Sequence, residues 1–418
     1  MNFKLSNDKI YKLRQMLLPA LAVIITISII RFPEEAFESA VKGIDVWLNI
    51  VLPALLPFFI GAQLLMGLGV VHFMGVLLEP FMRPLFNVPG SGSFVMAMGL
   101  ASGYPVGAML TGKIVKKGLC NTIEAERLIS FTNTADPLFM VGAVAVGMFK
   151  DVRLGTIIAI SHYISSLILG LIMRYHAKKY DATTPVSSRK RESLIIKAAR
   201  ELLRARRQDN RSFGQLIGDC IKDSINSMFI ILGFIILFSV IIKIINATGF
   251  INAIHPVINM FLNIFGLDES LSPAIVSGFF EITLGTQIAS QSPAPLIQKV
   301  ILASSIIAWS GLSVHFQVMS MVSDTKIRLM PYIYARILHA FLAGATTYVL
   351  MMLPINSFNS VALPAFGLSP QPTSQSWMSM FKASSKVFII LFLFMLFISV
   401  LIHVLRGLEV IGFKVVKK

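Results

Sequence analysis

Residues 91–112 read SGSFVMAMGLASGYPVGAMLTG. This segment is apolar enough to enter a membrane, yet it is rich in Gly and Ser, and Gly103-Tyr104-Pro105 interrupts it near the middle. Backbone that is not helical is tolerated at membrane depth only where protein or a water-filled cavity satisfies its polar groups. The segment therefore predicts a re-entrant hairpin beside a cavity rather than an ordinary membrane-spanning helix.

A second segment, residues 272–291, has the same character and reads SPAIVSGFFEITLGTQIASQ. We expect its break at Leu284-Gly285-Thr286, because glycine weakens the interior of a helix. If both segments crossed the membrane fully, the charge pattern of the chain between them would invert. Both are therefore predicted to be re-entrant hairpins.

The composition of the chain indicates lipid rather than water as its solvent. Of its 418 residues, 55% are hydrophobic and 14% are charged, whereas a soluble domain carries about a quarter charged residues. The formal net charge is +16, but the basic excess lies in short segments between apolar runs, which argues against nucleic-acid binding. The sequence also contains no nucleotide-binding or nucleophile motif and no metal-ligand spacing, so we expect no enzyme, no cofactor and no metal.

The apolar runs predict an all-α polytopic membrane protein, since a spanning helix needs about 20 apolar residues. The predicted spans are residues 15–30, 44–70, 125–148, 154–173, 224–245, 295–322, 331–353 and 386–404.

The charges between these spans predict the topology. By the positive-inside rule, basic residues place both termini, the loops at 113–117 and 326–328, and the long connection 178–211 in the cytoplasm. The acidic loop at 34–38 and the uncharged loop 354–381 then lie outside.

The order of predicted elements recurs in the two halves of the chain. Each half has three crossings, an odd number, so the second copy enters the membrane from the opposite side, which is the inverted-repeat plan of secondary transporters. The predicted domains are an N-terminal helix and loop (1–40), a first repeat (41–180), a basic linker (181–215), a second repeat (216–353) and a C-terminal segment (354–418).

The linker contains residues 191–207, in which an apolar stripe of Leu194, Ile195, Ala198, Leu202 and Ala205 is surrounded by Arg and Lys. This pattern is typical of a helix on the anionic inner leaflet. A solvated basic linker is the alternative.

Polar side chains inside the apolar segments are the candidate substrate-binding residues, because a charge at membrane depth costs about 2.5–3.5 kcal/mol. Pro137 disfavours helix at Asp136, so the span around it is expected to unwind. The candidates are Ser102, Gly103 and Tyr104 in the first hairpin; Ser130, Thr132, Asn133 and Asp136 in the unwound span; Glu281, Thr283, Thr286 and Gln287 in the second hairpin; and Ser304, Ser305 and Ser310 in the matching span.

Structural explanations exist for several of these residues. Gly99, Gly103 and Gly107 have a spacing that suits close helix packing, and a Ser or Thr in a span often bonds a carbonyl of its own helix. Trp309, beside the last candidate, is either a packing residue or a contact for an aromatic ring. Arg336, His162 and His339 are expected as partners of the buried carboxylates Asp136 and Glu281.

Three motifs carry a resemblance to a known family: EPFMRPLF at 79–86, MGLASGYPVGA at 98–108 and ERLISFTN at 126–133. With them the chain resembles the sporulation integral membrane proteins, which contain two nucleoside-recognition ("gate") domains. The resemblance implies a fold similar to that of concentrative nucleoside transporters, in which two hairpins and two unwound helices enclose the substrate. It also implies transport of dipicolinic acid from the mother cell toward the forespore, in the outer forespore membrane.

The first hypothesis is therefore a secondary transporter of a small polar or anionic solute, with possible coupling to protons or sodium and a possible homo-oligomeric state. If the solute is a dianion, we expect Glu281 to be protonated or bound to a cation when the solute is present. A nucleoside-type permease is one alternative. The other is a membrane scaffold for spore-envelope assembly, which would depend on the basic linker rather than on buried polar residues.

Overall fold

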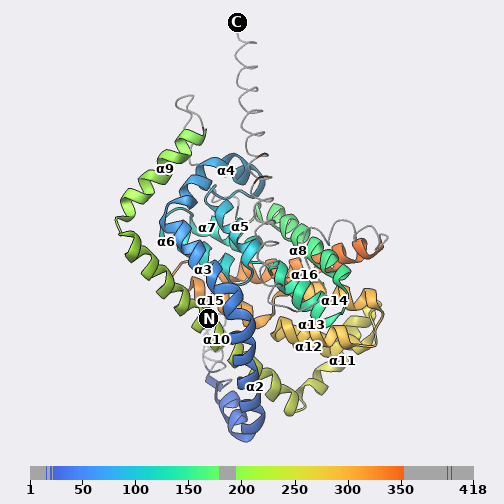
Figure 1. The fold of residues 1–418 in the computed structure, drawn as a ribbon. Coiled ribbons are helices and arrows are strands. Elements are labelled where there is room, and N and C mark those ends of the chain that lie inside the picture. The colour runs from blue at the N-terminus through green and yellow to red at the C-terminus, as the bar shows by residue number, and fades with distance from the viewer. Residues whose placement is uncertain are drawn as a thin grey trace, which may run out of the picture.

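The computed structural model describes residues 22–177 and 194–352, together with the single positions 16, 19, 20, 393 and 397. Every regular element in these residues is helical (Figure 1). The predicted span 386–404 apart from positions 393 and 397, the loop 354–381 and both termini lie outside the described residues, as do positions 15, 17, 18 and 21 of the predicted span 15–30.

After a short apolar helix, Ala22–Arg31, the elements follow without strands in the described ranges. They are α2 (Pro33–Val46), η1 (Trp47–Val51), α3 (Leu52–Gly67), α4 (Val70–Phe86), α5 (Gly92–Ser102), α6 (Val106–Lys116), α7 (Thr122–Thr132), η2 (Leu138–Met148), α8 (Val152–Met173), α9 (Leu194–Asp209), α10 (Phe213–Ala247), α11 (Phe250–Ile264), η4 (Glu269–Leu271), α12 (Ser272–Phe280), α13 (Ile282–Gln291), α14 (Leu296–Trp309), α15 (Gly311–Val322) and α16 (Leu329–Met352).

Four of the described helices are long and apolar enough to cross a membrane: Val152–Met173, Phe213–Ala247, Leu296–Val322 and Leu329–Met352. A fifth crossing results if the pair Phe59–Gly67 and Val70–Phe86, bent by 83°, is one span. The protein is therefore a polytopic membrane protein, as predicted. The predicted span 125–148 is instead divided between α7 and η2, and 44–70 is divided among α2, η1 and α3.

The two halves contain the same order of elements (Figure 1). In each, an apolar helix (α3 or α10) is followed by an amphipathic helix, a pair of short helices, a broken helix and a final long helix. The amphipathic helices α4 and α11 both begin after a glycine in the left-handed region, Gly69 with φ 86° and Gly249 with φ 69°. The inverted repeat itself, including the opposite membrane orientation of its copies, stays a prediction.

The first predicted hairpin breaks at Gly103-Tyr104-Pro105, as predicted. Helix α5 ends at Ser102 and α6 begins at Val106. Gly103 adopts φ 79°, a conformation that glycine tolerates best. A Cβ on Gly99 would lie 3.4 Å from the Cα of Gly107, so the two helices contact each other on either side of the break and the segment folds back on itself.

The second hairpin breaks three residues earlier than predicted. Glu281, not Leu284-Gly285-Thr286, separates α12 from α13, and it has extended backbone with φ −147° and ψ 132°. Its carboxylate accepts a hydrogen bond of 2.8 Å from the backbone N–H of Leu284 and thereby caps α13. Gly285 lies inside α13, where a Cβ would lie 2.6 Å from the backbone N of Gly278. The glycine serves the close approach of two helices rather than a break.

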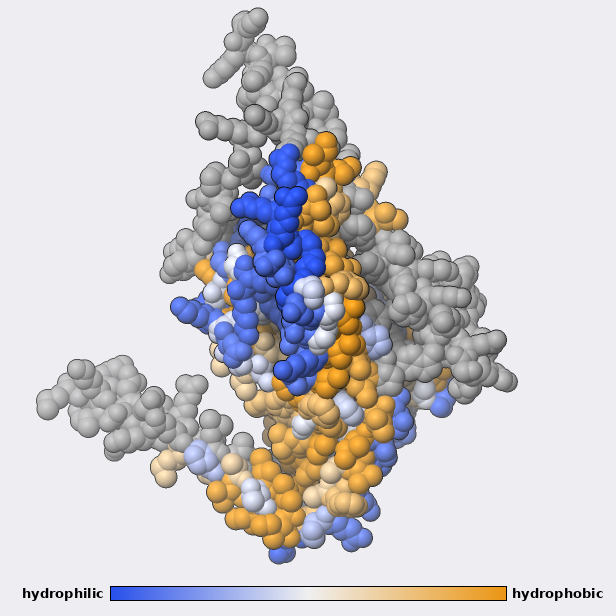
Figure 2. All heavy atoms as spheres, turned by 60° about the vertical axis from the view of Figure 1, so that its left-hand side comes forward, coloured by the Kyte–Doolittle hydropathy of each residue, from blue (hydrophilic) through white to orange (hydrophobic). Residues whose placement is uncertain are grey.

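The basic linker forms the helix α9, which packs against α4. Ala198 is buried, and a Cβ on Gly69 would lie 2.7 Å from the carbonyl oxygen of Leu202. Part of the apolar stripe that was expected to face lipid therefore faces α4. Ile195 remains 64% exposed, and Leu203 of the same helix is also exposed. Figure 2 shows a hydrophilic band on this side of the molecule, with a broad hydrophobic surface below it.

The junction between α9 and α10 is held by ion pairs. Arg211 contacts Asp209 at 2.7 Å and Asp219 at 2.9 Å. The hydrogen bond from Arg211 lowers the pKa of the Asp209 carboxyl below its ordinary value. Because that pKa is depressed, the ion pair persists at neutral pH and its contribution is lost only as the pH falls through the lowered value.

The glycine contact in the second hairpin generates a prediction. Gly285→Ala places a methyl group against the backbone of Gly278, which cannot move away as a side chain would, so we expect destabilisation of about 1–3 kcal/mol. Gly233→Ala is the matched control, because nothing lies within 4 Å of a Cβ at that exposed position in α10. Thermal unfolding of both variants in detergent measures the difference. Equal melting temperatures would show that α12 and α13 are not packed as described.

Candidate functional site

The helix that begins at Thr122 unwinds at a buried position. Helix α7 ends at Thr132, and Asn133 to Asp136 are not helical. Beyond Pro137 the chain continues as η2, and Asp136 Oδ1 accepts a hydrogen bond of 2.8 Å from the N–H of Phe139. The unwinding occurs where Pro137 removes a backbone donor, as predicted.

The tip of the first hairpin rests directly on this unwound segment. A Cβ on Gly103 would lie 2.6 Å from Asp136 Oδ2, and one on Gly99 would collide with the carbonyl oxygen of Thr132. The carbonyl of Thr132 also lies against Gly107. All three glycines are therefore required for close packing, which places the hairpin backbone beside the free backbone groups of the unwound segment.

The second half contains a corresponding break. Helix α14 ends at Trp309, and Ser310 and Gly311 adopt φ 72° and φ 70° before α15 continues. A Cβ on Gly311 would lie 2.8 Å from the carbonyl oxygen of Phe280 and 3.1 Å from the Cα of Glu281. Here too a hairpin tip packs against the break in the following helix.

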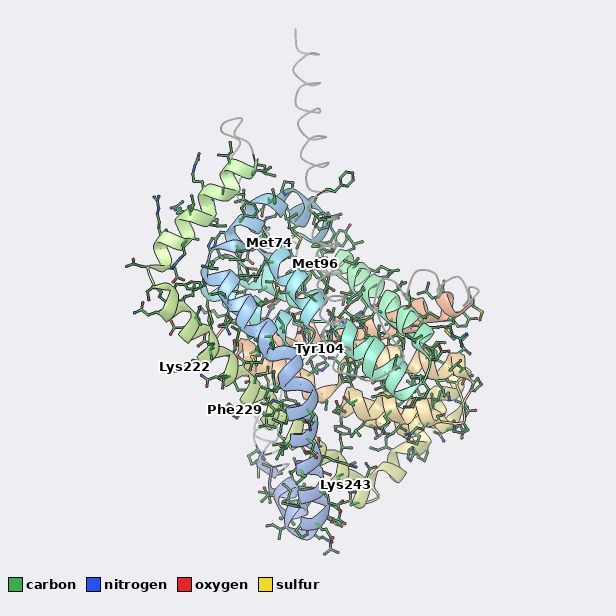
Figure 3. The ribbon with its side chains drawn as sticks, in the orientation of Figure 1. Met74, Met96, Tyr104, Lys222, Phe229 and Lys243 are labelled. Carbon is green, nitrogen blue, oxygen red and sulfur yellow. The ribbon has the colours of Figure 1, made fainter. Side chains whose placement is uncertain are left out.

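The two halves also contact each other through these elements. The Tyr104 hydroxyl, at the tip of the first hairpin, donates a hydrogen bond of 3.0 Å to the carbonyl of Ile307, which belongs to α14. In the opposite direction, the Thr286 hydroxyl of the second hairpin lies 3.4 Å from the sulfur of Met148 in η2. Figure 3 shows Tyr104 in the middle of the helices. Each hairpin thus contacts the broken helix of the other half.

Arg336 of α16 lies where the two breaks meet, and none of its surface is exposed. Its Nη1 donates to the carbonyls of Asn133 at 3.0 Å and Ala308 at 3.4 Å, and its Nη2 donates to the carbonyl of Ser130. The Tyr104 hydroxyl lies 3.5 Å from Nη1. One guanidinium therefore bonds carbonyls from the ends of both α7 and α14.

The remaining donor of this side chain, Nε, has no hydrogen-bond partner among the described residues. The guanidinium also lies over the ring of Tyr332, 5.4 Å from its centroid. Tyr332 in turn accepts a hydrogen bond of 3.0 Å from the Asn133 side chain. Asn133 is thus held between α16 and the N–H of Ala108, which bonds its Oδ1 at 3.3 Å.

The expected pairing of Glu281 with Arg336 or His339 is wrong. The Glu281 carboxylate bonds Leu284 and Thr283 at the start of its own helix, because a helix N-terminus offers unpaired N–H groups and a positive dipole end. Arg336 bonds carbonyls instead. The sequence contained a signal for its importance, since Arg336 is the only charged residue between 329 and 352, and an isolated charge in a span is a functional candidate.

The other candidates differ in burial and in the hydrogen bonds of their side chains. Ser102, Ser304 and Ser310 are buried, and their hydroxyls have no hydrogen-bond partner in the described part of the chain. The hydroxyls of Ser130, Thr132 and Thr286 bond carbonyls of their own helices, as structural residues do. Thr283 and Ser305 are half-buried and Gln287 is exposed.

An aromatic group borders the second break. The Trp309 ring stacks on Phe279 with centroids 5.7 Å apart, and the His315 ring lies 4.3 Å from it. The indole N–H donates to the carbonyl of Phe279 at 3.0 Å. Trp309 therefore fixes the end of α14 to the second hairpin.

An ion pair outside these breaks joins the halves at the end that the charge pattern places in the cytoplasm. Glu126 of α7 has no exposed surface, and it accepts hydrogen bonds of 2.7 and 2.9 Å from Arg328, which precedes α16. His176, after α8, lies 2.7 Å from the same carboxylate. Glu126 was not among the candidates, because nothing in the sequence indicates which residue 202 positions away would approach it.

Together, the apolar helices, the helix pairs α5–α6 and α12–α13 and the two buried breaks define a polytopic membrane protein with a buried polar centre. Comparison with known proteins agrees with this class: residues 48–177 match the nucleoside recognition ("Gate") family. Over 343 residues the chain is 39% identical to the sporulation integral membrane protein YlbJ of Bacillus subtilis (strain 168), covering 81% of this chain and 83% of that protein. The chain belongs to this family of sporulation integral membrane proteins. No solved structure matches it.

The Glu126 ion pair generates a second prediction. Glu126→Gln keeps the side-chain shape but replaces the charge-assisted bonds, so we expect a loss of about 1.5–3 kcal/mol of stability. Asp324→Asn is the control, because its pair with Lys116 also precedes α16 but is exposed on both sides, and such pairs contribute about 0–1 kcal/mol. Thermal unfolding in detergent measures both. A larger effect from Asp324→Asn would contradict the assignment.

Proposed function

We propose that this protein transports a small organic anion across the membrane, and that the anion is dipicolinic acid during sporulation. The observation that supports the proposal is the position of Arg336. A buried cation is costly unless it is paired or hydrogen-bonded, and this one lies at the junction of two helix breaks and two hairpins. The transporter would use no chemical step, so no catalytic residue is proposed.

The environment of Arg336 favours an anionic ligand. Carbonyl oxygens carry only partial charge, so the three that bond the guanidinium leave it positively charged. A carboxylate binds a guanidinium through two charge-assisted hydrogen bonds. The unpartnered Nε of Arg336 and the unpartnered hydroxyls of Ser102, Ser304 and Ser310 provide further donors for such a ligand.

Helix termini add to this positive character. Helix α6 begins at the first hairpin tip, and its N-terminus offers N–H groups and a positive dipole end. Glu281 already occupies the corresponding N-terminus of α13. The second hairpin therefore contributes less to anion binding than the first. The aromatic ring of Tyr104, at the first hairpin tip, would contact the planar ring of a solute such as dipicolinic acid.

The buried state of the centre requires movement during transport. Ser130, Asn133 and Arg336 have no exposed surface, so a solute reaches them only when hairpins or broken helices move apart. In the proposed cycle the two halves are inverted repeats and give access to each side of the membrane in turn. The termini would lie in the cytoplasm, and the protein would act in the outer forespore membrane, with a homo-oligomer possible.

Substitution of Arg336 tests this function. We expect Arg336→Gln to lower dipicolinate affinity roughly 10- to 100-fold, because a charge-assisted pair contributes about 1.5–3 kcal/mol. We expect Arg336→Lys to retain part of the affinity, because a lysine keeps the charge but not the two-point geometry. The control is Arg153→Gln, since Arg153 is half exposed and pairs with Asp151 at the start of α8. Binding to purified protein and uptake of labelled dipicolinate into proteoliposomes are the measurements.

The alternatives give different results. Folded wild-type protein that takes up no dipicolinate above empty liposomes would overturn the proposal. Uptake of a nucleoside instead, unaffected by Arg336→Gln, would indicate a nucleoside-type permease. A scaffold function would be indicated if apolar substitutions of Asn133 and Glu281 left sporulation intact while removal of α9 abolished it.

A further inference from the structure

Two buried histidines lie next to each other beside Arg336. His162 of α8 is 1% exposed and His339 of α16 is fully buried. Their ring centroids are 4.7 Å apart, with the ring planes tilted by 45°. His339 follows Arg336 by three positions on α16, so both side chains lie on the same face of that helix. The proposed anion site does not use either imidazole.

The hydrogen bonds of the first ring assign its tautomer. His162 Nε2 accepts a hydrogen bond of 3.1 Å from the backbone N–H of Ala135. That nitrogen therefore carries no proton, and in the neutral ring the proton is on Nδ1. The N–H at Nδ1 has no partner in the described residues.

The second ring has the opposite tautomer. His339 Nε2 lies 3.1 Å from the carbonyl oxygen of His162 and 2.9 Å from the Ser165 hydroxyl. A carbonyl only accepts, and the Ser165 hydroxyl already donates to the same carbonyl, so His339 Nε2 is a donor and carries the proton. His339 Nδ1 then carries a free lone pair, and this nitrogen is buried and without a partner within the described ranges.

We propose that His339 Nδ1 is the proton-binding site of this protein, and that a proton binds there together with the anion at Arg336. This inference rests on the proposed function. The proton comes from the aqueous side to which the site is open, and it adds to Nδ1 to form an imidazolium that is still held by its Nε2 donor bonds. The site thus takes up one cation without breaking a hydrogen bond.

The coupling follows from charge. Without an anion, a proton on His339 would place a second positive charge one helical turn from Arg336, in a region of low dielectric where like charges repel strongly. An anion on Arg336 removes that repulsion and attracts the proton. The proton in turn reduces the cost of moving a negatively charged solute through lipid. Anion and proton binding therefore favour each other, and by linkage the effect is reciprocal.

Other titratable and charged groups surround the pair and belong to the same electrostatic environment. They are Arg336 and Tyr332 of α16, Tyr163 of α8, Asp136 of the unwound segment, Tyr104 of the first hairpin and His315 of α15. Asp136 bonds the N–H of Phe139 at the start of η2. The two imidazoles differ from the other groups in that their rings contact each other and each has one buried ring nitrogen without a partner among the described residues.

Calorimetry of the purified full-length protein tests the inference. Dipicolinate is titrated at neutral pH in two buffers of different ionisation enthalpy, and the difference gives the protons taken up per solute bound. We expect net proton uptake with the wild-type protein. His339→Gln keeps an Nε donor for the His162 carbonyl and for Ser165 but removes the basic ring nitrogen, so we expect it to bind dipicolinate with proton uptake close to zero. His72→Gln, on α4, is the control and should retain the wild-type uptake.

The outcomes separate this inference from the proposed function. Wild-type protein that binds dipicolinate without proton uptake, or His339→Gln with unchanged uptake, overturns the proton site and leaves the transport proposal standing. Failure of folded wild-type protein to bind dipicolinate overturns both. If His339→Gln does not fold, wild-type proteoliposomes decide the question: accumulation of labelled dipicolinate should increase when the outside is made acidic, and equal accumulation with and without the gradient overturns the proton site.

Discussion

The guanidinium of Arg336 bonds carbonyl groups that the ends of two helices leave free. An ordinary helix satisfies its carbonyls internally, so an arginine could not find three of them in one place unless α7 and α14 both ended there. Conversely, an unwound segment inside a membrane needs donors that lipid does not provide. The buried cation and the two breaks therefore stabilise each other, and the burial of either alone would be costly.

Glycine contacts allow the hairpins to come close enough to close this centre. The carbonyl of Thr132 lies against both Gly99 and Gly107, and Gly311 lies against the tip residue Glu281. In each half a side chain at the glycine would separate a hairpin from the broken helix. The small residues thus do more than pack two helices together, because they determine how near the free backbone groups come to Arg336.

Local chemistry explains what the sequence could predict. Pro137 and Gly103-Tyr104-Pro105 act on the backbone of their own segments, so the breaks at 103–105 and 133–136 could be located without tertiary structure. Gly285 was misread because a glycine suits either a break or a close helix contact, and only the position of Gly278 distinguishes these. The contacts of Arg336 and of Glu126 could not be predicted, since each joins residues about 200 positions apart.

The crossed contacts limit how such a centre can open. Tyr104 of the first hairpin is bonded to α14, and Thr286 of the second hairpin touches η2, so neither hairpin can move without disturbing the broken helix of the other half. Arg336 is bonded to the ends of both broken helices, so movement of either one changes its hydrogen bonds. The Glu126–Arg328 pair also joins α7 to the segment that leads into α16, at the end that is predicted to be cytoplasmic. An anion that replaces carbonyls as a partner of Arg336 would loosen the connection between the halves at the moment when it binds. In the proposed transport function, occupation of the centre and separation of the halves would then be one event, a coupling that a scaffold would not need.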